Sequence, residues 1–251
     1  EGISGGLGFF VMQDRAGQGV INTTNVNAIY SYRLVINRKF SVKSGLQLSY
    51  FQKKLDWGKL TFGDMIDPRD GFVYTTHEVQ PKLNKGFVDF SAGFLGYSEE
   101  YFMGFAVHHL TQPEEGFIGD SKLPMRITVH GGAVIPFEKR RRGKRNIKDA
   151  SFSPNILYMK QRDFEELNYG FYVNKYPIVG GLWYRQSFSN SDAFVVLIGF
   201  QQTMFKIGYS YDLTVSKLSN ASGGAHELSF TWQFDCRPKK KKLRAISCPS
   251  F

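Results

Sequence analysis

Apolar and polar side chains alternate along most of the chain. In "HELSFTWQF" (residues 226–234), large apolar residues occupy every second position and polar residues fill the positions between them. "FKIGYSYDLTV" (205–215) and "VNAIYSYRLVI" (26–36) show the same period of two. Successive side chains of a β-strand point to opposite faces of its sheet. The pattern therefore predicts strands that have one apolar face and one more polar face.

This period recurs from one end of the chain to the other, without a convincing helical period or a domain boundary. No window approaches about 18 consecutive apolar residues, which excludes a transmembrane helix. We expect twelve strands, near residues 4–14, 23–38, 41–55, 85–97, 100–111, 124–137, 153–162, 166–175, 178–188, 191–202, 204–217 and 224–235.

The expected connections alternate in length. Long ones such as residues 56–84 and "TQPEEGFIGDSKLP" follow odd-numbered strands, and most even-numbered strands end in short turns such as "YSEE" and "NKYPI". Short turns on one side and long loops on the other are typical of outer-membrane barrels. A two-layer soluble sandwich shares the strand alternation and stays open as an alternative, as does a soluble β-protein with a basic tail.

Composition favours short alternating strands. Aromatic residues make up 16% of the 251 residues, there are 26 glycines, and the mean hydropathy is only −0.29. Short alternating strands suit this balance better than a thick apolar core does. The prediction is an all-β, transmembrane, antiparallel up-and-down β-barrel of about 12–14 strands over residues 1–235. A basic, periplasmic tail follows over 236–251.

The net charge of +10 is concentrated in two runs, "EKRRRGKR" and "KKKKLR". Both follow even-numbered strands, so both are expected on the short-turn, periplasmic side. The first run could dock an acidic periplasmic partner, be a solvated loop, or contact phosphates; the second could instead contact lipid headgroups. The candidate docking residues are Lys139, Arg140, Arg141, Arg142, Lys144, Arg145, Lys239, Lys240, Lys241 and Lys242.

Cys236 and Cys248 follow the last expected strand. In an oxidising compartment they could form a disulfide, worth about 3 kcal/mol from loop entropy. Two free thiols are the alternative, and two cysteines are too few for a metal site.

Several stretches resemble the PorP/SprF family of outer-membrane proteins. They are "GYSYDLTVSKL" followed by "GGAHELSF", together with "GFFVMQDRAG", "FAVHHLTQP" and the closing "CPSF". The resemblance runs from about residue 5 to the end, although an N-terminal segment usual in the family is missing, which suggests a fragment of a barrel with about fourteen strands.

The resemblance implies a component of type IX secretion, and of gliding motility in some members, in the outer membrane of a Gram-negative bacterium. It also implies outer-membrane lipid, periplasmic machinery, and secreted cargo or an adhesin as partners. It does not imply an enzyme. We expect no nucleic-acid partner for an outer-membrane barrel, since no aromatic stacking platform interrupts the first basic run.

Residues suited to chemistry are sparse. We expect no catalytic site, no cofactor and no metal site; His108 and His109 adjoin in an expected strand and should point to opposite faces. The carboxylates of Asp64, Glu114, Glu115 and Asp120 lie on expected outer loops, where they could meet cargo or simply be solvated.

The alternative function is a passive porin or small-solute channel. Its lumen would be lined by polar-face residues such as Lys206, Asp212, Glu227 and Gln233.

Overall fold

The computed structural model describes residues 5–137, 150–188, 190–215 and 223–234. These residues form one 13-stranded sheet, one small two-stranded sheet and three short 3-10 turns. No helix in these ranges is long and apolar enough to cross a membrane. The strands of the main sheet are β1 (Gly5–Ala16), β2 (Ile21–Val35), β3 (Ser41–Leu55), β6 (Asn84–Tyr97), β7 (Tyr101–His108), β8 (Arg126–Ala133), β9 (Ile135–Pro136), β10 (Ser151–Gln161), β11 (Phe164–Lys175), β12 (Ile178–Ser187), β13 (Asn190–Gln201), β14 (Phe205–Thr214) and β15 (Ala225–Trp232).

The main strands follow one another in chain order. The order in the sheet is β1-β2-β3-β6-β7-β8-β10-β11-β12-β13-β14-β15, with β9 paired to β10, so the path is open and ends at β1 and β15. The paired strands whose registers are described are antiparallel. This confirms the predicted all-β, up-and-down meander, and the twelve strands on the path match the twelve expected segments.

By its internal contacts the chain divides into two compact units. One contains residues 1–32, 45–92 and 107–125, and the other contains residues 33–44, 93–106 and 126–251. The expectation of a single barrel over 1–235 with a tail over 236–251 stays a prediction.

Two expected strands end early for local reasons. The strand expected over 100–111 stops at His108, because His109 adopts a left-handed backbone with φ +59°. The strand expected over 124–137 is interrupted at Val134, which is 2% exposed and donates its N–H to the carbonyl of Glu100 at 2.7 Å.

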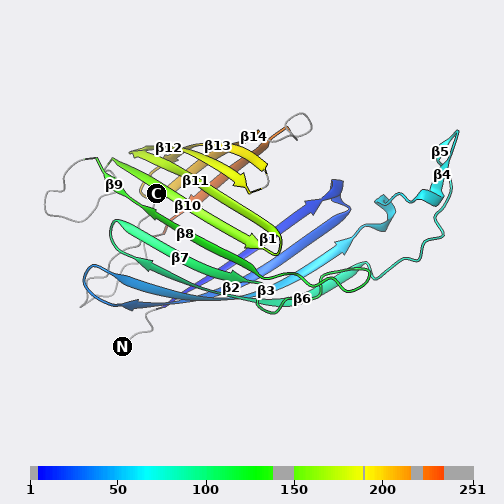
Figure 1. The fold of residues 1–251 in the computed structure, drawn as a ribbon, viewed down its shortest axis with the longest axis horizontal. Helices are drawn as coiled ribbons and strands as arrows, with labels where there is room; N and C mark the ends of the chain where they lie inside the picture. Colours follow the sequence, from blue (N-terminus) through cyan, green and yellow to red (C-terminus); the bar gives the residue numbers. More distant parts are fainter. Residues whose placement is uncertain (1–4, 138–149, 189, 216–222, 235–251) are drawn as a thin grey trace. The chain divides into compact units, whose positions relative to one another are not determined.

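The long connection between β3 and β6 is more ordered than its sequence suggested. It contains the strand pair β4 (Ile66–Asp67) and β5 (Gly71–Phe72), and the 3-10 turns η2 (Trp57–Lys59) and η3 (Gly63–Met65). Figure 1 shows β4 and β5 at the far end of this excursion. Their turn, "DPRDG", uses Gly71 at φ +77°, a backbone conformation that glycine adopts readily.

The burial pattern is inverted relative to a water-soluble protein. Among the described residues the fully buried side chains are mostly small and polar, such as Asn27 and Ser153, each 1% exposed. Large apolar side chains are exposed instead: Leu228 is 81% exposed and Ile198 61%. A continuous exposed apolar surface of this kind marks contact with lipid or another apolar phase.

Strand register explains the inversion. Ile198 on β13 pairs with Tyr209 on β14, which pairs with Leu228 on β15, so one apolar row crosses three strands. The neighbouring row joins Leu197, Ser210 and Glu227 on the opposite face. A slip of one residue would exchange the two rows.

The two faces give a direct test. We expect Ile198→Arg to lower the free energy of unfolding in lipid by about 2–4 kcal/mol, the cost of arginine on the lipid face near the bilayer middle. Urea unfolding of the chain in lipid vesicles measures this change. Ser210→Arg is the matched control on the polar face beside Glu227, and should cost far less. Equal losses for both variants would contradict the assignment of faces.

Candidate functional site

In the unit that contains residues 126–251, an ion pair on the polar face joins two non-adjacent strands. Arg185 on β12 donates from Nη2 to the Oδ2 atom of Asp212 on β14, across the intervening strand β13. The small side chain of Ala193, opposite Arg185, leaves room for the guanidinium. The two side chains are 29% and 17% exposed, so each charge needs the other as a partner.

Other polar groups share this face, as the alternation predicted. Lys206 faces Thr231, and Glu227 faces Ser210, whose hydroxyl donates to the Glu227 carboxylate at 3.2 Å. Gln233 lies just beyond the end of β15, and its N–H donates to the carbonyl of Met204. The face therefore presents charges of both signs rather than a field of one sign.

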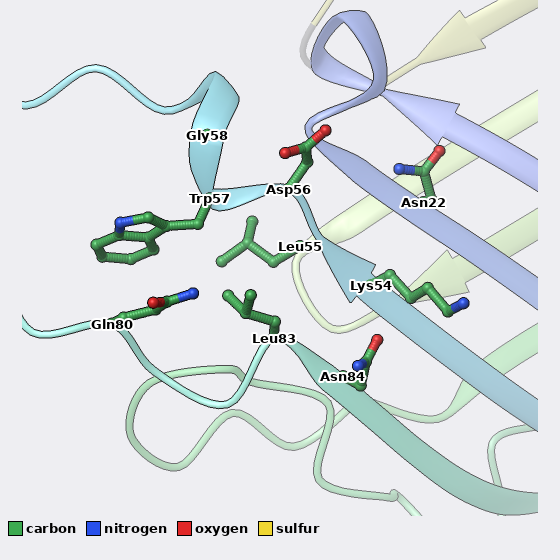
Figure 2. Close-up of a pocket in the computed structure, with 9 residues that line it drawn as sticks. All are labelled: Asn22, Lys54, Leu55, Asp56, Trp57, Gly58, Gln80, Leu83 and Asn84. Atoms are coloured by element: carbon green, nitrogen blue, oxygen red, sulfur yellow. The ribbon is translucent and has the colours of Figure 1, made fainter.

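An open hollow of about 500 Å³ lies in the first unit, where β3 ends and β6 begins. Figure 2 shows Leu55 and Leu83 at its centre, with Trp57 and Gln80 along one side. The N–H of Leu55 donates to the carbonyl of Leu83 at 2.8 Å, which joins the two strand ends. The lining residues are Asn22, Lys54, Leu55, Asp56, Trp57, Gly58, Gln80, Leu83 and Asn84. These nine lining residues mix apolar side chains with amide and charged groups.

Two aspartates organise the excursion between β3 and β6. The carboxylate of Asp64 accepts the N–H of His77 at 2.7 Å and the hydroxyl of Thr76 at 3.0 Å. The backbone N–H of His77 is the largest cause that lowers the pKa of Asp64 below its usual value. Asp67 accepts the N–H of Arg69 and the hydroxyl of Tyr74, and its pKa is lowered in the same way. Both carboxylates therefore have a structural role in holding the loop.

The other expected loop carboxylates differ in their surroundings. Glu115 pairs with Lys53 at 2.5 Å, Glu114 accepts the N–H of Ser121, and Asp120 is exposed. The expectation of a simply solvated side chain is wrong for Glu115, since its carboxylate pairs with a strand lysine. Contact with cargo stays a prediction.

The histidine expectation also changes. His109 lies outside β7, and its left-handed backbone turns the ring toward Asp89, with Nδ1 and Oδ2 2.8 Å apart. The prediction that His108 and His109 point to opposite faces of one strand is therefore wrong; their ring centroids are 6.4 Å apart. Within the described ranges, no group of three or more His, Cys, Asp or Glu side chains is placed to hold a metal ion.

Several predicted residues lie outside the part of the chain that the structure describes. They are the first basic run (Lys139, Arg140, Arg141, Arg142, Lys144 and Arg145), the lysines 239–242, and the two cysteines, Cys236 and Cys248. Docking by the basic residues and a disulfide between the cysteines stay predictions.

The comparisons with known proteins give one match. The family model described as "Type IX secretion system membrane protein PorP/SprF" matches residues 2–232. Neither a curated protein nor a solved structure matches the chain. The family match spans every strand of the main sheet.

The hydrogen bonds of Asp64 predict a pH dependence in this loop. Because the pKa of Asp64 is lowered on folding, its stabilising effect is present above the ordinary value of 3.8 and is lost as the pH falls through the lower, folded pKa. NMR titration of the Asp64 carboxyl carbon should give a midpoint below 3.8, with the amide of His77 shifting over the same range. Asp64→Asn should abolish the shift of that amide. A midpoint at or above the ordinary value would contradict the assignment.

Proposed function

Because the chain belongs to the PorP/SprF family of type IX secretion system membrane proteins, we propose that it is a non-enzymatic outer-membrane barrel that supports export or surface attachment of cargo. The cargo would carry a C-terminal secretion domain. The family is a membrane β-barrel, and the antiparallel sheet with its exposed apolar rows has the strand chemistry of one. A role in gliding motility is a further part of the proposal.

The observation that carries the proposal is the family match over residues 2–232 combined with the inverted burial. Apolar rows such as that of Ile198 and Leu228 suit lipid contact. The polar face holds an ion pair and hydrogen-bonded carboxylates, which hold the wall together without forming a reactive centre. A membrane scaffold that positions partners needs both an apolar, lipid-facing surface and a rigid sheet.

Docking to periplasmic machinery through the two basic runs is part of the proposal. Strand direction supports it: β8 and β15 run the same way, because the antiparallel path from β8 through β10 to β15 contains six pairings. The first run follows β8 and β9, and the lysines follow β15. Both runs therefore leave the sheet on one side, and we propose that this side is the periplasmic one. The connection between β10 and β11 (162–163), on the other side, is as short as the one between β11 and β12 (176–177), so turn length does not decide between the two sides.

Deleting the gene tests the secretion role. We expect proteins with type IX C-terminal domains to disappear from the culture medium and the cell surface, as measured by quantitative proteomics. Loss of a single adhesin would narrow the role to one cargo. A change confined to solute uptake would replace the proposal with the porin alternative.

Reversing the first basic run tests the docking role. The variant carrying Arg140→Glu, Arg141→Glu, Arg142→Glu and Arg145→Glu should lose most periplasmic partners in co-purification, because each new carboxylate repels an acidic surface. Heat-modified mobility in gels should show an intact barrel. Arg69→Glu with Lys82→Glu, on the long connection between β3 and β6, is the control and should keep the partners. Unchanged co-purification of the first variant would remove the docking role and leave the secretion role standing.

A further inference from the structure

The segment that follows β7 lies against the polar face of β3 and β6. We call residues 109–123 the strap. Lys53 on β3 contacts Glu115 of the strap at 2.5 Å, and Lys85 on β6 donates to the carbonyl of Gly116 at 2.6 Å. In Figure 1 the green trace after β7 passes the ends of β3 and β6. All these residues belong to the first compact unit.

The two lysines explain why the strap is needed there. The N–H of Leu55 bonds to the carbonyl of Leu83, and Lys53 and Lys85 are each two residues from these positions along antiparallel strands. The rings of Phe51 and Phe87 stack at 5.0 Å in the same register. The two ammonium groups are therefore cross-strand neighbours, and like charges in this position destabilise a sheet. The carboxylate of Glu115 and the carbonyl of Gly116 offset that repulsion.

A second anchor lies deeper on β6. Asp89 is 1% exposed, and its two carboxylate oxygens are satisfied by Nδ1 of His109 and the hydroxyl of Thr111, each at 2.8 Å. The ring of His109 also packs 6.3 Å from that of Phe51. A buried carboxylate without such partners would be costly. The start of the strap therefore supplies the hydrogen-bond partners that the buried carboxylate of Asp89 needs.

The strap has its own internal structure. Glu114 and Lys122 form an isolated antiparallel bridge, and the N–H of Leu123 donates to the carbonyl of Pro113 at 2.9 Å. At the tip a Cβ on Gly116 would meet the side chain of Ser121 at 2.8 Å, so the close turn needs glycine there. The strap is a compact hairpin bound at its base and middle, with Asp120 exposed near its tip.

We infer that the strap is an inward-folded constriction of the barrel, held on the lumen wall by Lys53, Lys85 and Asp89. The inference rests on the proposed barrel, in which the polar face lines the lumen. Barrels of about eight strands are filled by side chains, whereas those of 16–18 strands leave an aqueous channel. A wall of about twelve strands lies between these limits, so a folded hairpin on it decides whether ions pass. The protein is then a closed scaffold and not an open porin.

Charge exchange at the first contact tests this. The chain is reconstituted into planar bilayers, and the ion current of the native protein is compared with Lys53→Glu, Glu115→Lys and the double variant that carries both changes. Each single variant replaces the attraction between residues 53 and 115 with a repulsion between like charges. In a two-state equilibrium between a bound and a released strap, the released, conducting state should be populated about tenfold more. The double variant restores opposite charges and should return to the low native current. Asp120→Lys makes the same charge change near the exposed tip and is the control.

Hydrogen exchange of the reconstituted variants reports the strap itself. Residues 109–123 should exchange faster in both single variants and regain protection in the double variant. The inference is overturned if the strap loosens while the current stays at the native level, or if the native protein conducts as freely as the single variants. It is equally overturned if the strap keeps its protection in both single variants. The current needs no secretion partner, so its result is independent of the proteomic and docking tests.

Discussion

The requirement that backbone polar groups be paired within lipid governs this protein. A strand that crosses hydrocarbon must bond to a neighbour on each side, and its side chains must then alternate between lipid and interior. The exposed row of Ile198 and Leu228 and the buried Asn27 and Ser153 are two results of that one requirement. In a water-soluble protein, buried polar side chains and exposed apolar ones would indicate that no core has formed. For a sheet in lipid this arrangement is expected. The large apolar side chains lie on the face that contacts lipid, so the opposite face is left to small polar side chains.

Much of the fold follows from this period of two. Alternation alone located all twelve strands of the path and placed Lys206, Asp212 and Glu227 on one face. It could not identify contacts that depend on register or on a single backbone angle. Lys53 and Glu115 are 62 residues apart, and nothing in "FAVHHLTQP" requires the left-handed His109 that directs the strap toward β6. The β4–β5 pair was detectable in principle, since "DPRDG" has the aspartate, proline and glycine of a tight turn.

Charged side chains on the polar face form ion pairs within the sheet or with the strap. Arg185 is matched by Asp212, and Lys53 by Glu115, in contacts that span non-adjacent strands or a strand and the strap. Cross-links of this kind stiffen a sheet that has little apolar core of its own. Each of these contacts joins opposite charges, whereas an ion-selective pore uses rings of one charge to choose its ions. This pairing of opposite charges agrees with the proposed role as a support for partners.

The cross-strand lysines have a consequence for how the protein assembles. If β6 slipped by one residue against β3, Lys85 and Asp89 would turn to the lipid side while Lys53 stayed inside. The strap would then find neither its second cation nor its buried carboxylate, and the carboxylate of Asp89 would face lipid. Only the correct pairing presents all three groups together. The strap can therefore settle only after β3 and β6 have aligned, and its docking would act as a proofreading step during biogenesis.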